Sequence, residues 1–191
     1  MSVSQFRFKY KLALKLLVVF IFAVPVLWIV LDPSGQRWAD VTLLRILGNP
    51  SINMDFSALS GNESVDDLRK IYPKLELSCS AKGPEDVLNQ DCFAQIAAIN
   101  ELPARYLAFN FRDGRLNRVK VSYRAAYHEM LYGQLSAVYG QPAADKMGGL
   151  ENQVVKWQTG PGMVIMKAVV SKKDDNQLFW ITPGYDAASS N

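Results

Sequence analysis

The sequence predicts an α+β protein with one N-terminal transmembrane helix, followed by an exported domain of two helix-plus-antiparallel-sheet units. Three observations predict this class: a long apolar run near the N-terminus, segments of alternating polarity after it, and two similar helical patterns that each precede such segments. The predicted parts are a cytoplasmic tail (1–11), the transmembrane helix (12–31), a juxtamembrane connector (32–50), a periplasmic α+β domain (51–185) and a disordered tail (186–191).

Residues 12–31, LALKLLVVFIFAVPVLWIVL, form a run of 20 residues whose one charge is Lys15. At ~1.5 Å per residue, such a helix crosses a hydrocarbon core of ~30 Å. Basic and no acidic residues precede Leu16, so the positive-inside rule predicts a single-pass protein of the bacterial inner membrane with a cytoplasmic N-terminus. A cleaved signal peptide is the alternative, but the run is long and WIVLDPSG is a poor cleavage site. Both interpretations export the remaining chain.

The exported residues are nearly balanced in charge. Residues 1–31 hold four of the 21 Lys and Arg and none of the 18 Asp and Glu, which leaves 17 basic against 18 acidic residues, a net charge of −1. The basic pI of the whole chain therefore reflects topology. We expect no nucleic-acid partner, because a nucleic-acid-binding domain needs a basic surface of its own.

The chain has two cysteines, Cys79 and Cys92. In an oxidising compartment we expect them to form a disulfide that closes a polar loop and contributes about 3 kcal/mol. Two free buried thiols are the alternative. The spacing is not C-x-x-C, which argues against a redox pair, and two cysteines with one histidine make a metal site the least favoured reading. We expect no metal and no cofactor.

Sequence patterns in the connector 32–50 and in the first half of the domain predict two helices and two strands, and one segment fits either. Apolar residues recur every three positions from Trp38 to Leu47, which indicates a short helix lying on the membrane or on the domain. SINMDFS (51–57) alternates strictly and predicts a strand. The next segment, GNESVDDLRKIYP, predicts a helix with a capping box at Ser64 and Asp67. KLELSCS predicts a second strand, and CFAQIAAI fits a helix or a strand.

The clearest local signal is a hairpin in YLAFNFRDGRLNRVKVSY (106–123). Apolar residues alternate on both arms, and Asp113-Gly114 is a strong two-residue turn. Leu116 breaks the alternation of the second arm, so we expect a β-bulge near Asn117.

The second half repeats the order of helix and strands. AYHEMLYGQLSAVYG (126–140) predicts a helix, QPAADKMGGLEN a loop, and QVVKWQT, MVIMKAVV and QLFWITP three strands joined by the turns GPG and KKDDN. Trp157, Phe179 and Trp180 on these strands are expected in the core. LRKIYPK (from 68) and LSAVYGQ (from 135) match at three positions with a constant offset of 67 residues, which indicates two related units whose sheets share a core.

Tyr139, Gly140 and Pro142 form a Y-G-x-P motif, and the strand that follows carries Trp157. This order resembles the repeats of β-lactamase-inhibitory-protein-like domains, and small outer-membrane assembly lipoproteins have a similar build. The resemblance covers about residues 50–183. It implies helical elements packed on small antiparallel sheets, in proteins that bind other proteins without catalysis. The membrane anchor and the cysteine pair in the first half only depart from that family, so no binding residues are carried over.

Catalytic constellations are not evident in the sequence. His128 is the only histidine, and we expect it to be a partly exposed packing residue of the second helix. The acidic pairs Asp66-Asp67, Glu85-Asp86 and Asp174-Asp175 fall at a helix start or in turns, where carboxylates favour local structure. We therefore expect a protein that is not an enzyme.

Basic residues cluster in and around the predicted hairpin, opposed locally by Asp113 alone. They are Arg105, Arg112, Arg115, Arg118, Lys120 and Arg124. A solvated sheet face or a guarded edge strand explains such a cluster. The functional alternative is a positive surface for an acidic partner, lipid headgroups or a cell-wall polymer. As the candidate site we take Arg112, Arg115, Arg118, Lys120 and Arg124.

The sequence favours a membrane-anchored periplasmic protein-interaction module, an accessory or assembly subunit whose partner is another envelope protein. The anchor is the main argument, because a tether raises the effective concentration of the domain near membrane partners. A periplasmic inhibitor or immunity-type protein that binds an enzyme is the alternative, which rests on the family resemblance. A hydrolase or small-ligand receptor is the third hypothesis, and a closed apolar pocket with convergent polar groups would favour it.

Overall fold

The computed structural model describes residues 3–81, 89–146, 153–171 and 176–182. The chain divides into two compact units, Met1–Leu43 and Leu44–Asn191. The predicted KKDDN turn (but for Asn176), the disordered tail, the second half of the QPAADKMGGLEN loop and the acidic pairs Glu85-Asp86 and Asp174-Asp175 lie outside the described residues.

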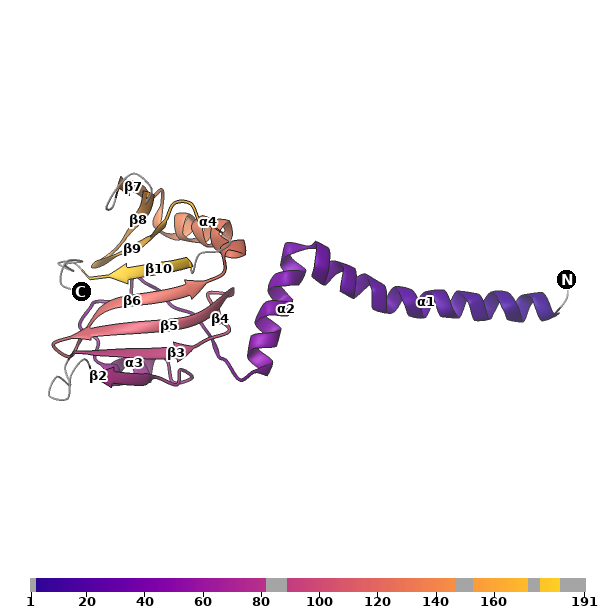
Figure 1. Cartoon of the computed structure of the whole chain (residues 1–191), viewed down its shortest axis with the longest axis horizontal. Coiled ribbons are helices and arrows are strands. Elements are labelled where there is room, and N and C mark those ends of the chain that lie inside the picture. Colours follow the sequence, from indigo (N-terminus) through magenta and orange to yellow (C-terminus); the bar gives the residue numbers. More distant parts are fainter. Residues whose placement is uncertain (1–2, 82–88, 147–152, 172–175, 183–191) are drawn as a thin grey trace. The chain divides into compact units, whose positions relative to one another are not determined.

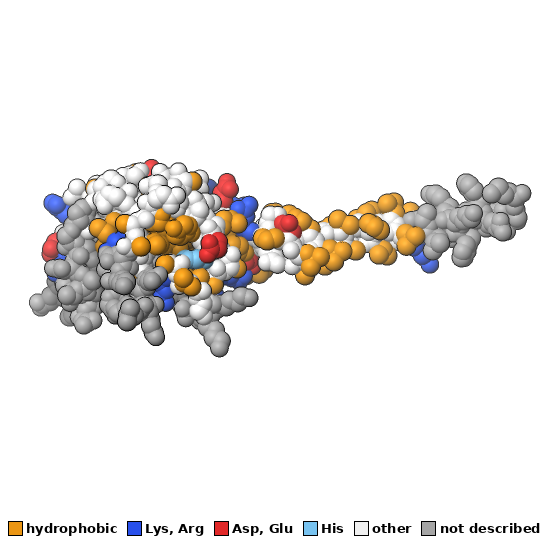
Figure 2. Space-filling model, turned by 90° about the horizontal axis from the view of Figure 1, so that it is seen from above, with side chains coloured by type: hydrophobic (Ala, Val, Ile, Leu, Met, Phe, Trp, Pro, Cys, Tyr) orange, Lys and Arg blue, Asp and Glu red, His pale blue; other side chains and the backbone are white. Residues whose placement is uncertain are grey.

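The first unit contains helix α1 (Val3–Leu31) and most of α2 (Pro33–Ile46). The stretch Leu14–Leu31 has a mean hydropathy of 2.8 and is long and apolar enough to cross a membrane, as the sequence predicts. Its side chains form an apolar surface, seen as orange along the helix in Figure 2. A helix also occupies most of the predicted connector, because the Asp32 carboxylate accepts hydrogen bonds from the backbone N–H groups of Ser34 (2.8 Å) and Gly35 (3.3 Å) and so caps α2.

The second unit is built on one ten-stranded sheet. Its strands are β1 (Ser51–Ile52), β2 (Ser78–Ala81), β3 (Gln90–Gln95), β4 (Ala98–Ile99), β5 (Leu102–Arg112), β6 (Arg115–Tyr123), β7 (Ala143–Lys146), β8 (Gln153–Thr159), β9 (Gly162–Lys167) and β10 (Asn176–Ile181). The long strands lie side by side in the order β2-β3-β5-β6-β10-β9-β8-β7, as Figure 1 shows, and β4 with β1 continues from the start of β5. The α+β class is therefore confirmed.

The sheet departs from the prediction in two respects. Helix α3 (Val65–Ile71) precedes β2 to β6, and helix α4 (His128–Tyr139) precedes β7 to β10, but the strands form one continuous sheet. The reason is the antiparallel pairing of β6 with β10, which runs from Arg118↔Ile181 to Tyr123↔Asn176. The sheet is also mixed, because β1 pairs parallel to β4.

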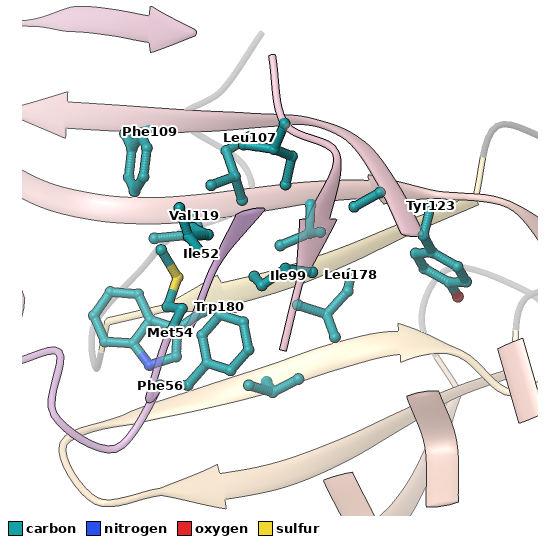
Figure 3. Packing of buried hydrophobic residues seen from close by; sticks show 14 of the residues in the cluster. Ile52, Met54, Phe56, Ile99, Leu107, Phe109, Val119, Tyr123, Leu178 and Trp180 are labelled. Atoms are coloured by element: carbon teal, nitrogen blue, oxygen red, sulfur yellow. The ribbon is translucent and has the colours of Figure 1, made fainter. Parts of the chain in front are cut away.

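One face of the sheet carries the core. A row of buried residues crosses the strands in register, from Cys92 through Phe109, Val119, Trp180 and Val164 to Trp157. Leu68 of α3 and Leu131 and Leu135 of α4 pack on this face. The segment from Ile52 to Phe56 runs across it, where Figure 3 shows Met54 and Phe56 beside Trp180. Each such buried side chain contributes roughly 1.5–3 kcal/mol.

The segment 51–57 alternates in burial as predicted, yet only Ser51–Ile52 forms a strand. Beyond it, the Asn100 side chain replaces a neighbouring strand: its Oδ1 accepts from Met54 N (2.7 Å) and its Nδ2 donates to Met54 O (2.9 Å).

CFAQIAAI forms the strands β3 and β4. The prediction of a loop at 141–152 is wrong in part, because Ala143–Lys146 pairs with β8 as strand β7.

Three local predictions are confirmed. Asp113 (φ 52°) and Gly114 (φ 76°) form a two-residue turn with positive φ at both positions, as a type I′ hairpin requires. Asn117 is the extra residue of a bulge, because Asn110 pairs with Arg118 and Phe111 with Leu116. The capping box of α3 is also present, with Asp67 N donating to Ser64 Oγ and Ser64 N donating to Asp67 Oδ2.

Candidate interaction surface

The sheet face opposite the core is called here the outer face. Strand alternation places on it the row Phe93, Ala108, Lys120, Phe179 and Ile165, which are cross-strand neighbours. Phe93 is 40% exposed, whereas Phe109 and Val119 on the core face are fully buried. Ile165, at the other end of the outer row, is also buried, with 7% exposed. Both α3 and α4 pack on the core face, so in the described part of the domain neither helix covers the outer face.

Aromatic rings and cations of the outer face contact one another. The Phe93 and Tyr106 rings lie 4.9 Å apart between centroids, and Lys120 Nζ lies 5.5 Å from the centroid of Tyr106. Arg118 Cζ lies 5.9 Å from the ring centre of Phe179. These are cation–π distances, and such contacts hold both the ring and the charge in place. Ordered aromatic and arginine side chains are typical of protein–protein interfaces.

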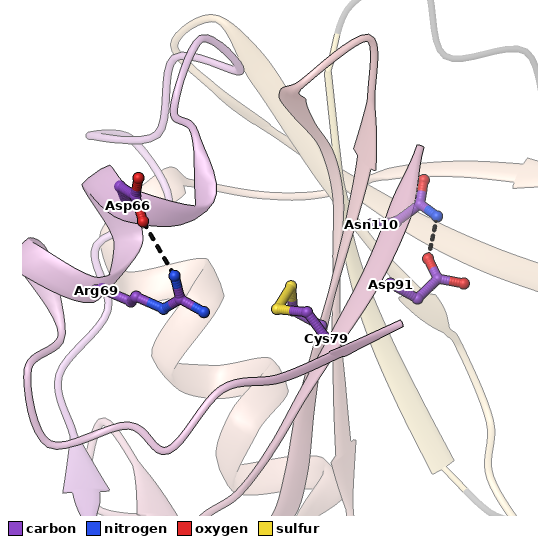
Figure 4. The surroundings of a disulfide bond; sticks show 6 residues. Asp66, Arg69, Cys79, Asp91 and Asn110 are labelled. Carbon is purple, nitrogen blue, oxygen red and sulfur yellow. Dashed lines mark hydrogen bonds and ion pairs between the residues drawn. A yellow bond between two sulfur atoms is a disulfide. The ribbon is translucent and has the colours of Figure 1, made fainter. Parts of the chain in front are cut away.

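The charge of the outer face is uneven. Among the described residues its basic side chains are Arg112, Arg115, Arg118, Lys120, Lys156 and Lys167, placed by the strand register. Asp91 is acidic, and its carboxylate accepts a hydrogen bond from the Asn110 side chain of the neighbouring strand (Figure 4). The excess of basic residues favours an acidic binding partner.

The structure places the predicted basic residues of the hairpin in two groups. Arg118 and Lys120 lie on the outer face. The cross-strand pair Arg112 and Arg115 beside the turn lies on it too, because the neighbouring pair Phe111 and Leu116 is buried on the core face. Arg124 follows the other end of β6 and lines a cleft there with Arg105. At ~3.3 Å per residue, β6 separates its ends by ~26 Å. Four of the five candidate residues thus share the outer face, and Arg124 lies apart from them; their part in binding stays a prediction.

The turn end forms a cleft of about 620 Å³ lined by Arg112, Arg115 and the loop 60–62. Glu63 organises this loop by accepting hydrogen bonds from the backbone and hydroxyl of Ser60, both 2.8 Å. Burial alone would raise the pKa of Glu63, but the hydrogen bonds from Ser60 and Gly61 hold it below its usual value. The Glu63 carboxylate thus stabilises the conformation of the loop 60–62.

His128 is buried, with 2% of its surface exposed, so the prediction of a partly exposed residue is wrong. The Tyr123 hydroxyl lies 2.9 Å from Nδ1, and the Ala168 carbonyl oxygen lies 3.3 Å from Nε2. Because a carbonyl can only accept, Nε2 donates, and in the neutral ring Nδ1 accepts from Tyr123. Burial raises the pKa of the Tyr123 phenol, which keeps that donor protonated. His128 therefore joins β6, α4 and the segment after β9.

Tyr123→Phe tests this arrangement. The variant leaves a buried imidazole nitrogen without its donor, so we expect the free energy of unfolding to fall by about 1–3 kcal/mol. Urea unfolding followed by circular dichroism measures the change. Tyr132→Phe is the control, because Tyr132 contacts Trp157 through its ring, and its loss of a hydroxyl should change stability by less than about 0.5 kcal/mol. Equal stability of the two variants would contradict the assignment.

The carboxylate pair Asp66-Asp67 has the structural role expected of it. Asp67 caps α3, and Asp66 forms an ion pair of 3.0 Å with Arg69, drawn in Figure 4. Within the described ranges, His, Cys, Asp and Glu form no group of three that could hold a metal ion.

Cys79 and Cys92 form the predicted disulfide. They face each other directly across β2 and β3, and Cys92 is fully buried in the core. Figure 4 shows the disulfide at Cys79. The bond fastens the short edge strand β2 to the sheet. Such a bond fits an oxidising compartment.

A groove of about 480 Å³ lies between α4 and the segment around Phe56. Its lining includes the apolar residues Val121, Leu135 and Leu178, and Glu101 is its charged residue. It opens beside Val138, which is 69% exposed, so it is not the closed pocket that a small-ligand receptor would show.

The aromatic part of the outer face was not predicted. Phe179 was expected in the core, but it points away from it between Leu178 and Trp180, which are both buried as the alternation demands. The prediction is confirmed for Trp157 and Trp180 and wrong for Phe179. Alternation within QLFWI was the available signal, since neighbouring strand residues face opposite sides.

No protein-family model, curated protein or solved structure matches this chain. Its function is therefore inferred from the surfaces described above.

Proposed function

We propose that the protein is a membrane-anchored, non-enzymatic protein-interaction module, an accessory or assembly subunit of a bacterial envelope complex. In this proposal α1 crosses the inner membrane with its N-terminus in the cytoplasm, and the α+β domain is periplasmic. An N-terminal helix long and apolar enough to span a bilayer supports the anchor, and the Cys79–Cys92 disulfide supports an oxidising compartment. Tethering confines the domain near other envelope proteins and raises its effective concentration.

The outer face carries this proposal. It presents the ring pair Phe93–Tyr106 and the cations Arg118 and Lys120 on the strands of a rigid sheet. Binding to such a surface costs little conformational entropy, because the side chains are already ordered by their mutual contacts. The partner is expected to present an acidic surface with apolar side chains that cover the rings.

The double charge reversal Arg118→Glu/Lys120→Glu tests the outer face. We expect it to reduce recovery of the partner by about tenfold or more, since reversed charges on an interface repel an acidic surface. The measurement is a mild-detergent pull-down of the full-length tagged protein from native membranes after crosslinking, with the partner quantified by mass spectrometry.

The matched control is Arg69→Glu/Lys70→Glu, which makes the same charge change on α3, the helix that packs on the core face. It should retain the partner, and thermal unfolding should show both variants folded. Unchanged recovery with the outer-face variant, or equal loss with the α3 variant, would contradict the outer face as the binding surface.

The inhibitor or immunity-type alternative stays a prediction, as does the resemblance to β-lactamase-inhibitory-protein-like domains. The order of the elements supports both, because one helix precedes β2 to β6 and another precedes β7 to β10. Replacing α1 by an unrelated membrane anchor separates the two functions. An inhibitor should keep its effect with any anchor or with none, whereas an assembly subunit should lose its effect when its domain is released from the membrane.

A further inference from the structure

The chain turns sharply between α1 and α2, at Asp32. Trp28 and Trp38 are ten positions apart, which corresponds to ~15 Å along a straight helix, yet their ring centroids are 6.2 Å apart. The Gln36 side chain reaches back to donate to the Val30 carbonyl oxygen at 2.8 Å. Helix α2 therefore leaves the end of α1 at a steep angle, and Figure 1 shows the corner between the two helices.

Gly35 sits inside this corner. A Cβ atom at Gly35 would lie 2.8 Å from the carbonyl carbon of Trp28 and 2.9 Å from Cα of Ile29. Such distances are shorter than real Cβ contacts, so the close approach of the two helices needs a residue without a side chain. The cap by Asp32 and the contact at Gly35 together fix the direction in which α2 departs.

One side of α2 faces the same way as Gly35. Spacings of three and four residues place Trp38, Thr42 and Ile46 in line with Gly35. Trp38 and Ile46 are 55% and 76% exposed, and Leu43 beside this line is 57% exposed. The charged residues Arg37 and Asp40 project from the opposite side of the helix. The side turned toward α1 thus carries exposed apolar groups along its centre, and Arg45, seven positions after Trp38, flanks it.

We propose that α2 lies in the headgroup region of the bilayer that α1 crosses, with the side of Gly35, Trp38 and Ile46 turned toward the lipid. This inference rests on the proposed membrane anchoring. The apolar stretch of α1 ends at Leu31, and α2 begins two residues later at a steep angle, so its path follows the membrane surface. The side of α2 that faces α1 also faces the bilayer into which α1 descends. Tryptophan at this depth suits the interface.

An interfacial α2 would limit where the domain can act. Only residues 47–50 separate the end of α2 from β1. At most ~3.5 Å per residue, this link reaches ~14 Å. Partners of the outer face would therefore be membrane proteins or proteins bound at the membrane surface.

Tryptophan quenching by brominated lipids tests the position of α2. The full-length Trp28→Phe variant is reconstituted in phosphatidylcholine and phosphatidylglycerol vesicles whose lipids carry bromine either near the headgroup or near the chain ends. Trp157 and Trp180 are 1% and 0% exposed inside the domain, so lipid quenching in this variant reports Trp38. We expect headgroup-proximal bromine to quench Trp38 more strongly than deep bromine does.

The double variant Trp28→Phe/Trp38→Phe is the matched control and should lose the quenching. Quenching no stronger than in this control, in vesicles where the protein resists carbonate extraction, would overturn the interfacial position while leaving the anchor intact. Stronger quenching by deep bromine would also overturn it, because α2 would then lie within the hydrocarbon. Extraction of the protein by carbonate would overturn the anchor and this inference together.

Discussion

Removal of the disulfide by Cys79→Ala with Cys92→Ala is expected to lower the free energy of unfolding by about 3 kcal/mol. The two cysteines are 13 positions apart, and cross-linking them restricts the unfolded chain. The bond also holds β2, an edge strand that pairs with β3 alone among the described strands. Urea unfolding of the isolated protein measures the change, and it should appear as a lower midpoint.

Reduction provides the control for this prediction. Wild-type protein treated with dithiothreitol should lose nearly the same stability, because its sulfur atoms stay in place while the cross-link is gone. The double variant should not respond to dithiothreitol. Any further difference between reduced wild type and the variant reports packing at Cys92, which is fully buried. A variant as stable as the oxidised wild type would contradict a stabilising disulfide.

Gly162→Ala is expected to destabilise the domain by about 1–3 kcal/mol through overpacking. A Cβ atom at Gly162 would lie 2.7 Å from the Ile181 carbonyl oxygen and 2.7 Å from the Trp180 indole. The indole cannot move aside without loss, because it is fully buried and its Nε1–H donates to Thr159 Oγ1 at 3.1 Å. Thermal or urea unfolding measures the loss, and near-ultraviolet circular dichroism should report a changed tryptophan environment.

Gly133→Ala is the matched control for this substitution. Gly133 is an exposed position of α4, and nothing lies within 4 Å of the added methyl group. Alanine favours a helix over glycine by about 0.5–1 kcal/mol, so this variant should be more stable than the wild type. Opposite signs for the two substitutions are the expected result. Equal effects would show that the close contact at Gly162 does not determine stability.

Sequence reasoning succeeded where the signal lies within a few residues. The Asp113-Gly114 turn, the capping box at Ser64 and the bulge at Asn117 depend on neighbouring residues, whose conformations are set locally. The strands β5 to β6 and β8 to β10 were likewise predictable, because their alternation reflects one buried face. The spanning stretch of α1 follows from hydropathy alone.

Features that depend on residues far apart in the chain could not be predicted. Strand β1 ends at Ile52. Beyond it, the Asn100 side chain, 46 residues after Met54, makes the hydrogen bonds to Met54 that a neighbouring strand would otherwise make. Strand β7 is polar and short, and it forms because β8 offers it a free edge. The separation of Arg124 from the other basic residues follows from geometry, since Arg124 comes after the last residue of β6, at the end away from the turn.

The continuity of the sheet depends on β6 and β10, whose partners Val119 and Trp180 are about sixty residues apart. During synthesis from the N-terminus, β2, β3, β5 and β6 can pair before the last strands leave the ribosome. Until β10 arrives, β6 is an open edge in a nascent chain, where unwanted pairing with other chains begins. Arg118 and Lys120 lie on this edge, so they are placed to act as gatekeepers against aggregation before they act in the folded protein.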